Sequence, residues 1–184
     1  MWDRSAGFVY RGCSLCRHGT YERETPAGAR VARWYCPESH TTFSLLPDCL
    51  AARLPGTLAD LEAVVVTVEE ARSVEAAANA LRRDAVELPG ALRWVRRRVL
   101  LVRNVLARVI GLIPDRLAGC AATMVAVRAR LDSGNALMEL RDLVSAQLRA
   151  LPAPLGFQPH GLGMRSRKPV FQHSMGPDPP PVAS

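Results

Sequence analysis

The fold is decided at residues 54–70, LPGTLADLEAVVVTVEE, where a Leu-Pro-Gly turn is followed by a helix start signal. Thr57 and Asp60 have the spacing of a capping box. In this motif the threonine hydroxyl accepts a hydrogen bond from the third helical N–H, and the carboxylate accepts one from the threonine N–H. We therefore expect a helix from about Leu58 to Glu70, and a domain boundary at the turn before it.

The region after this turn, residues 54–151, is rich in Ala, Leu, Val and Arg, as expected for a helical domain. Ser73 is suited to cap a second helix over residues 74–82. A third helix is expected from residue 88 to about residue 110, because Pro89 suits a first helical turn and apolar residues then recur at helical spacing.

Two further helices are expected before the chain becomes rich in proline. Asp115 is a candidate cap for a helix that ends near Leu131, and Ser133 for another over residues 135–151. Residues 152–184 contain eight of the 14 prolines and lack apolar periodicity, which predicts a disordered tail.

The region before the turn, residues 1–53, has a different composition. It contains four of the five cysteines, two of the three tryptophans and all three tyrosines. Together with the helices above, this predicts a mainly α protein with a small N-terminal β module of the zinc-ribbon type.

The cysteines of this module have metal-ligand spacing. Cys13 and Cys16 form a C-x-x-C pair, and Cys36 follows after 19 intervening residues, within the range of a zinc ribbon. A symmetric ribbon would have a fourth cysteine at position 39, where this chain has Ser39. His40 stands one position further on, so the predicted ligand set for a structural Zn²⁺ is three thiolates and one imidazole.

Other interpretations of the cysteines stay open at this point. His18 and Cys49 compete for the fourth ligand position, and the ribbon can also be a degenerate one that no longer binds metal. A disulfide framework and a redox-active C-x-x-C are less favoured, because the chain shows no export signal and no strand–helix repeat.

The net charge is +7, from 24 basic and 17 acidic residues, and Lys168 is the single lysine. The excess is concentrated in residues 82–108, which contain eight arginines against Asp84 and Glu87. Such a stretch is typical of an element that faces nucleic acid, and the alternative is a solvated helix face.

No segment has the length and apolarity of a membrane span. The best candidate, residues 99–113, is interrupted by Arg103 and Arg108. The N-terminus lacks the apolar core of a signal peptide, so we expect a cytoplasmic protein without membrane contacts.

Two segments of the N-terminal half carry a family resemblance. Residues 30–36, RVARWYC, followed by residues 42–48, TFSLLPD, resemble the transposase-like zinc-ribbon proteins of bacteria. The resemblance covers roughly residues 10–105. It implies a zinc ribbon followed by a helix-turn-helix, as in the N-terminal region of insertion-sequence transposases. The positions that match the family's ligands are Cys13, Cys16 and Cys36, and the family's fourth cysteine is absent.

The helix-turn-helix would span about residues 73–105. Residues 73–81 resemble its first helix and residues 90–98 its recognition helix, although the connection is longer than the three or four residues usual for the motif. Trp94 is expected mainly to pack in the core. The candidate DNA-binding residues are Arg93, Arg96, Arg97, Arg98 and Arg103.

We find no carboxylate triad, phosphate loop or other catalytic constellation, and we expect the chain not to be an enzyme. The sequence predicts a protein that binds double-stranded DNA and lacks a catalytic domain of its own. The alternative is an interaction module with a degenerate ribbon. In it the run from Val64 to Val68 would be buried against a partner or a second copy of the chain.

Overall fold

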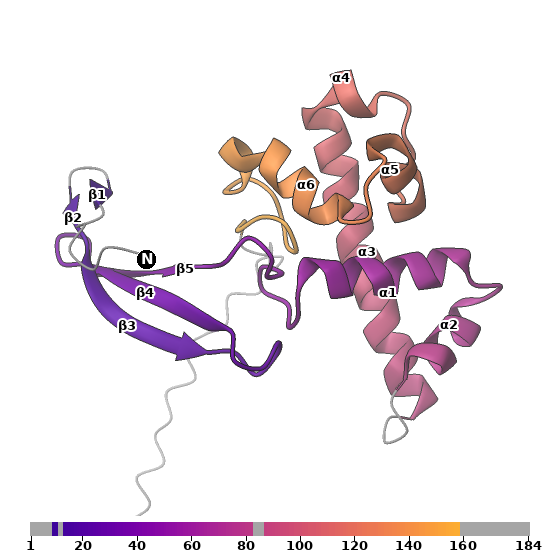
Figure 1. The fold of residues 1–184 in the computed structure, drawn as a ribbon, viewed down its shortest axis with the longest axis horizontal. Helices are drawn as coiled ribbons and strands as arrows, with labels where there is room; N and C mark the ends of the chain where they lie inside the picture. Colours follow the sequence, from indigo (N-terminus) through magenta and orange to yellow (C-terminus); the bar gives the residue numbers. More distant parts are fainter. Residues whose placement is uncertain (1–8, 11–12, 83–86, 159–184) are drawn as a thin grey trace, which may run out of the picture.

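The computed structural model describes residues 9–10, 13–82 and 87–158. Its fold is mainly helical, with a small three-stranded antiparallel sheet near the N-terminus, which confirms the predicted fold class. The sheet projects from one side of the helical domain (Figure 1). In the described ranges no helix has both the length and the apolar character needed to cross a membrane.

The sheet has the strand order β3-β4-β5, and a separate antiparallel pair, β1-β2, precedes it. The strand bounds are β1 Val9–Tyr10, β2 Cys13–Ser14, β3 Cys16–Glu22, β4 Arg30–Cys36 and β5 Thr41–Leu45. A small apolar cluster covers one face, with Leu15 and Cys36 buried and Trp34 and Phe43 packed against them. A sheet this small buries little apolar surface.

The first three helices have nearly the bounds that the sequence predicts: α1 Leu58–Glu70, α2 Val74–Leu81 and α3 Leu88–Leu112. The capping box is confirmed, because Asp60 N donates to Thr57 Oγ1 over 3.0 Å and Thr57 N donates to Asp60 Oδ2 over 3.1 Å. Ser73 caps α2 as expected.

The later helices are shorter than expected: α4 Pro114–Leu117, α5 Met124–Leu131 and α6 Ala136–Leu143, followed by a 3-10 turn at Ser145–Gln147. The helix expected from Asp115 is interrupted because Gly119 has φ +71°, a left-handed conformation that ends α4. A new helix then begins with Thr123 as its cap. Asp115 lies inside α4 and is not a cap.

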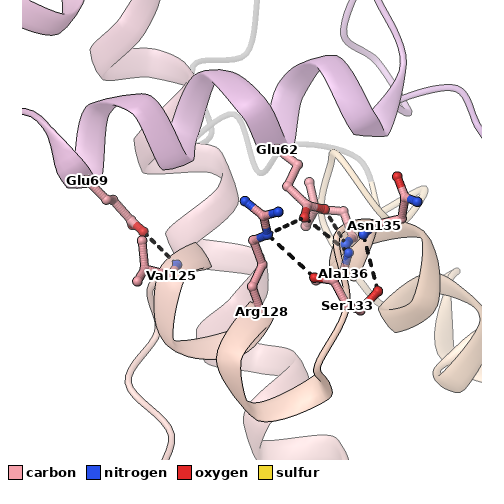
Figure 2. Close-up of polar contacts among 8 residues, drawn as sticks. Glu62, Glu69, Val125, Arg128, Ser133, Asn135 and Ala136 are labelled. Atoms are coloured by element: carbon pink, nitrogen blue, oxygen red, sulfur yellow. Dashed lines mark hydrogen bonds and ion pairs between the residues drawn. The ribbon is translucent and has the colours of Figure 1, made fainter.

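Two glutamates of α1 cap the N-termini of α5 and α6 from a distance (Figure 2). Glu62 is 2% exposed and accepts hydrogen bonds from the N–H groups of Ala136 and Leu137, over 3.2 and 2.8 Å. Glu69 accepts a bond of 3.0 Å from the Val125 N–H. Ser133, the expected cap of α6, accepts a hydrogen bond from the Asn135 N–H instead.

The main core lies where α1 crosses α3 and where α5 and α6 pack against α1 (Figure 1). Its members come from residues 51–66 and from α3 onward, and they include Leu58, Leu106 and Met124. The helical domain begins before the predicted boundary at residue 54, since Leu50, Ala51 and Ala52 are already buried.

Residues 152–158 differ from the expected disordered tail, of which 159–184 lie outside the described residues. Ala153 and Leu155 are fully buried. The buried Arg141 side chain donates to the carbonyls of Pro154 and Leu155 over 2.9 and 3.2 Å. The proline content suggested disorder, but these residues pack because a buried cation satisfies their carbonyl groups.

The sheet is attached to the helical domain by Arg23, which follows β3. Its guanidinium donates to the carbonyls of Ala51 and Leu54 over 3.3 and 2.7 Å. The Gly56 N–H also donates to the Thr25 carbonyl over 3.1 Å. The contact is therefore polar and involves mainly the loop before α1.

Candidate nucleic-acid interface

The helices α2 and α3 pack together through a second apolar cluster, separate from the main core. Its buried members are Val68, Ala77, Ala78, Ala91 and Val95. Three of the five are alanines, which allow the helices to approach closely. The N-terminal half of α3 is therefore held by α2 and the end of α1, with its opposite face exposed.

That exposed face carries two of the predicted DNA-binding residues. Arg93 and Arg97 lie one helical turn apart, and both are exposed. Within the described ranges, neither makes a hydrogen bond or an ion pair. These two guanidinium groups are available for contacts with an anionic partner.

Two other predicted residues have acidic partners in the chain. Arg96 Nη2 lies 3.3 Å from Glu75 Oε1 of α2, and both side chains are more than half exposed. Arg103 Nε lies 3.4 Å from Oε1 of Glu69, whose side chain is 4% exposed. Arg103 therefore helps to hold the carboxylate that caps α5, and DNA contact would compete with this role.

The fifth predicted residue, Arg98, is stacked on Trp94. The guanidinium carbon lies 3.8 Å from the ring centroid, which is the geometry of a cation–π contact. Burial lowers the pKa of Arg98, and the neighbouring charge of Arg97 lowers it further. Trp94 is 40% exposed, so it does not pack in the core as the sequence led us to expect.

Together these positions define a basic ridge, which we take as Arg93, Arg96 and Arg97 on the N-terminal half of α3. One acidic group, Glu75 of α2, pairs with Arg96 of the ridge, whereas Arg93 and Arg97 have no acidic partner among the described residues. The ridge can therefore present net positive charge to solvent. The distant caps have no local sequence signal, because each joins residues more than fifty positions apart.

The predicted zinc ligands are divided between the two faces of the sheet. Cys16 pairs with Tyr35 in the β3-β4 register, so the two share a face. The Tyr35 hydroxyl lies 2.8 Å from Nδ1 of His40, which places the imidazole near that same side. Cys36 follows Tyr35 in β4 and lies on the opposite face, buried beside Leu15.

The structure places the described candidate ligands in different surroundings. Cys36 is disulfide-bonded, whereas Cys16 is free and exposed. Over the described part of the chain, no group of three His, Cys, Asp or Glu side chains is placed to hold a metal ion. The Cys13 side chain lies outside the described residues, so the full ligand set stays a prediction.

The competing ligands, His18 and Cys49, belong to different segments of the N-terminal module. His18 lies near Tyr35, with 5.9 Å between their ring centroids. Cys49 lies beyond β5 and is exposed. Both His18 and His40 lie beside Tyr35, so a metal ion bound by either histidine would lie near this tyrosine.

The valine run expected to meet a partner is covered within the chain. Val65 and Val66 belong to the main core, and Val68 to the cluster between α2 and α3. Val64 is half-buried and lines a pocket. The run therefore gives no support to a partner-binding surface.

Searches of protein-family models, of curated proteins and of solved structures find nothing that matches this chain.

Proposed function

We propose that this protein binds double-stranded DNA through the basic ridge of α3. The observation that carries the proposal is the exposed pair Arg93 and Arg97, which have no acidic partner among the described residues. Unpaired arginines one turn apart on a supported helix can pair with the phosphates of a nucleic-acid backbone.

The packing of α3 supports this use. Its apolar face is buried against α1 and α2, so the helix axis is fixed while the ridge is presented outward. A helix placed in this way can enter a major groove, with residues of its N-terminal half reaching phosphates or base edges. Arg96 can join the ridge by leaving Glu75, because that ion pair is exposed and weak.

The proposal is tested by anisotropy titrations of the full chain with a labelled random-sequence duplex at several salt concentrations. We expect the logarithm of the association constant to fall linearly with the logarithm of salt concentration. The double variant Arg93→Gln with Arg97→Gln should reduce this slope by about 1.8, at roughly 0.9 for each lost phosphate contact.

The matched control is Arg116→Gln with Arg130→Gln, which removes the same charge from exposed positions of α4 and α5. We expect the control to keep most of the wild-type slope. Equal losses in the two double variants would show a nonspecific charge effect and contradict a ridge on α3. Undetectable binding by the wild type at low salt would also contradict it.

A further inference from the structure

A pocket of about 660 Å³ lies between α1, α2 and the N-terminal half of α3. Its apolar lining includes Leu61 and Val64 of α1, Ala78 and Leu81 of α2, and Ala91 of α3. The volume is in the range of roughly 300–1,000 Å³ that is typical of small-molecule sites. The pocket can therefore hold a compact organic molecule.

The polar part of the pocket is dominated by arginine. Trp94 and Arg98, stacked on each other, form one wall, and Arg82 lies at the end of α2. Arg82 Nε already donates to Asn79 Oδ1 over 2.9 Å. Among the described lining residues the single acidic one is Asp60, whose carboxylate accepts a hydrogen bond from the Thr57 N–H in the capping box.

Arg98 differs from these groups because it lacks a polar partner. Within the described ranges it makes no hydrogen bond and no ion pair, although it is partly buried. Its desolvation and the adjacent Arg97 charge both disfavour the cation, as the lowered pKa of Arg98 shows. An anionic group in the pocket would offset both penalties by pairing with the guanidinium.

We propose that this pocket binds a small aromatic organic anion, with its ring on the apolar wall and Trp94 and its acidic group on Arg98. The aromatic class follows from the half-exposed indole and the aliphatic lining, and the anionic class from the unpaired guanidinium. This site is separate from the solvent face of α3 and goes beyond the proposed DNA binding.

The test uses the full chain without DNA and two fluorescent probes. One is 8-anilinonaphthalene-1-sulfonate, and the other is N-phenyl-1-naphthylamine, which has the same rings without the sulfonate. We expect saturable binding of the sulfonate by the folded protein. Arg98→Gln should weaken that binding about tenfold and leave the neutral probe nearly unaffected.

Two further variants make the result specific to the pocket. Val64→Phe adds a ring into the pocket and should weaken both probes, whereas Arg116→Gln removes an exposed charge outside the pocket lining and should weaken neither. Circular dichroism of each variant establishes that it is folded, because partly folded chains also bind the sulfonate.

The proposal is overturned if the wild type shows no saturable binding, or if Arg98→Gln and Arg116→Gln bind the sulfonate equally well. It is also overturned if Val64→Phe is folded and binds both probes as the wild type does. Because no DNA is present, these outcomes do not depend on whether the ridge of α3 binds a duplex.

Discussion

The helical domain and the N-terminal sheet are stabilised in different ways. In the helical domain a large apolar core surrounds α1, and buried polar groups of distant segments are satisfied by Glu62, Glu69 and Arg141. In the sheet, the cluster contains two buried residues, and the buried Trp34 Nε1 donor has no hydrogen-bond partner among the described residues. The difference indicates that the helical domain supplies most of the free energy of unfolding. The sheet depends on local contacts or on a cross-link such as the disulfide of Cys36.

The largest effect is expected at Arg141, which holds both ends of the helical domain together. The residue is 3% exposed, and its guanidinium donates to four carbonyls, those of Asp48, Leu50, Pro154 and Leu155. Arg141→Met fills similar space but leaves these acceptors without their donor. We expect the free energy of unfolding in urea to fall by about 3 kcal/mol or more.

The control for this variant is Arg116→Met, at an exposed position of α4. It should change the free energy of unfolding by less than about 0.5 kcal/mol. If Arg141→Met also stays within that range, the carbonyls are satisfied without the guanidinium. The C-terminal residues 152–158 would then not be held in the way that the structure indicates.

An intermediate effect is expected at the two capping glutamates of α1. The Glu62 carboxylate accepts from two N–H groups and lies 3.3 Å from Arg128 Nε. Glu62→Gln removes its charge and should lower the free energy of unfolding by about 2 kcal/mol. Glu69→Gln weakens the cap at the Val125 N–H and the ion pair with Arg103. It should lower the free energy of unfolding by about 1 kcal/mol.

The adjacent Glu70→Gln is a matched control, because Glu70 is exposed at the end of the same helix. Urea unfolding of the three variants should give the order Glu62, Glu69, Glu70 from largest to smallest loss. If Glu62→Gln loses no more stability than Glu70→Gln, the carboxylate does not cap α6 as described.

The sequence predicted the elements whose signals are local. Thr57 with Asp60 and Ser73 are caps formed within four residues, and they are found where expected. The capping of α6 by Glu62, and of α5 by Glu69 in addition to its local cap Thr123, was missed because both glutamates are far away in the chain. Local patterns do not contain this information, since a glutamate inside a helix normally indicates a solvated face.

The same distinction applies to the candidate site. The arginines of α3 could be identified from composition, but their separation into free, paired and stacked groups could not. It depends on Glu75 of α2 and Glu69 of α1, which reach Arg96 and Arg103 only after the helices pack. The pocket beside Arg98 likewise arises from three helices and has no local sequence signal.

The smallest effect on global stability is expected in the sheet, at His40. This residue has φ +50°, so His40→Asn is suitable, because asparagine tolerates a left-handed backbone while lacking the imidazole. Its contact with Tyr35 is exposed. We expect the urea transition of the helices, followed by circular dichroism, to change by less than about 0.5 kcal/mol.

The same variant tests the sequence-based zinc site. The protein is kept reduced, because a disulfide-bonded Cys36 cannot act as a thiolate ligand. The prediction is about one equivalent of zinc in the wild type and its loss in His40→Asn. If His40→Asn keeps the zinc of the wild type, the fourth ligand is His18, Cys49 or water. If the wild type itself contains no zinc, the predicted site is contradicted. A large loss of helical stability in this variant would instead contradict the independence of the two regions, because His40 makes its described side-chain contact within the sheet.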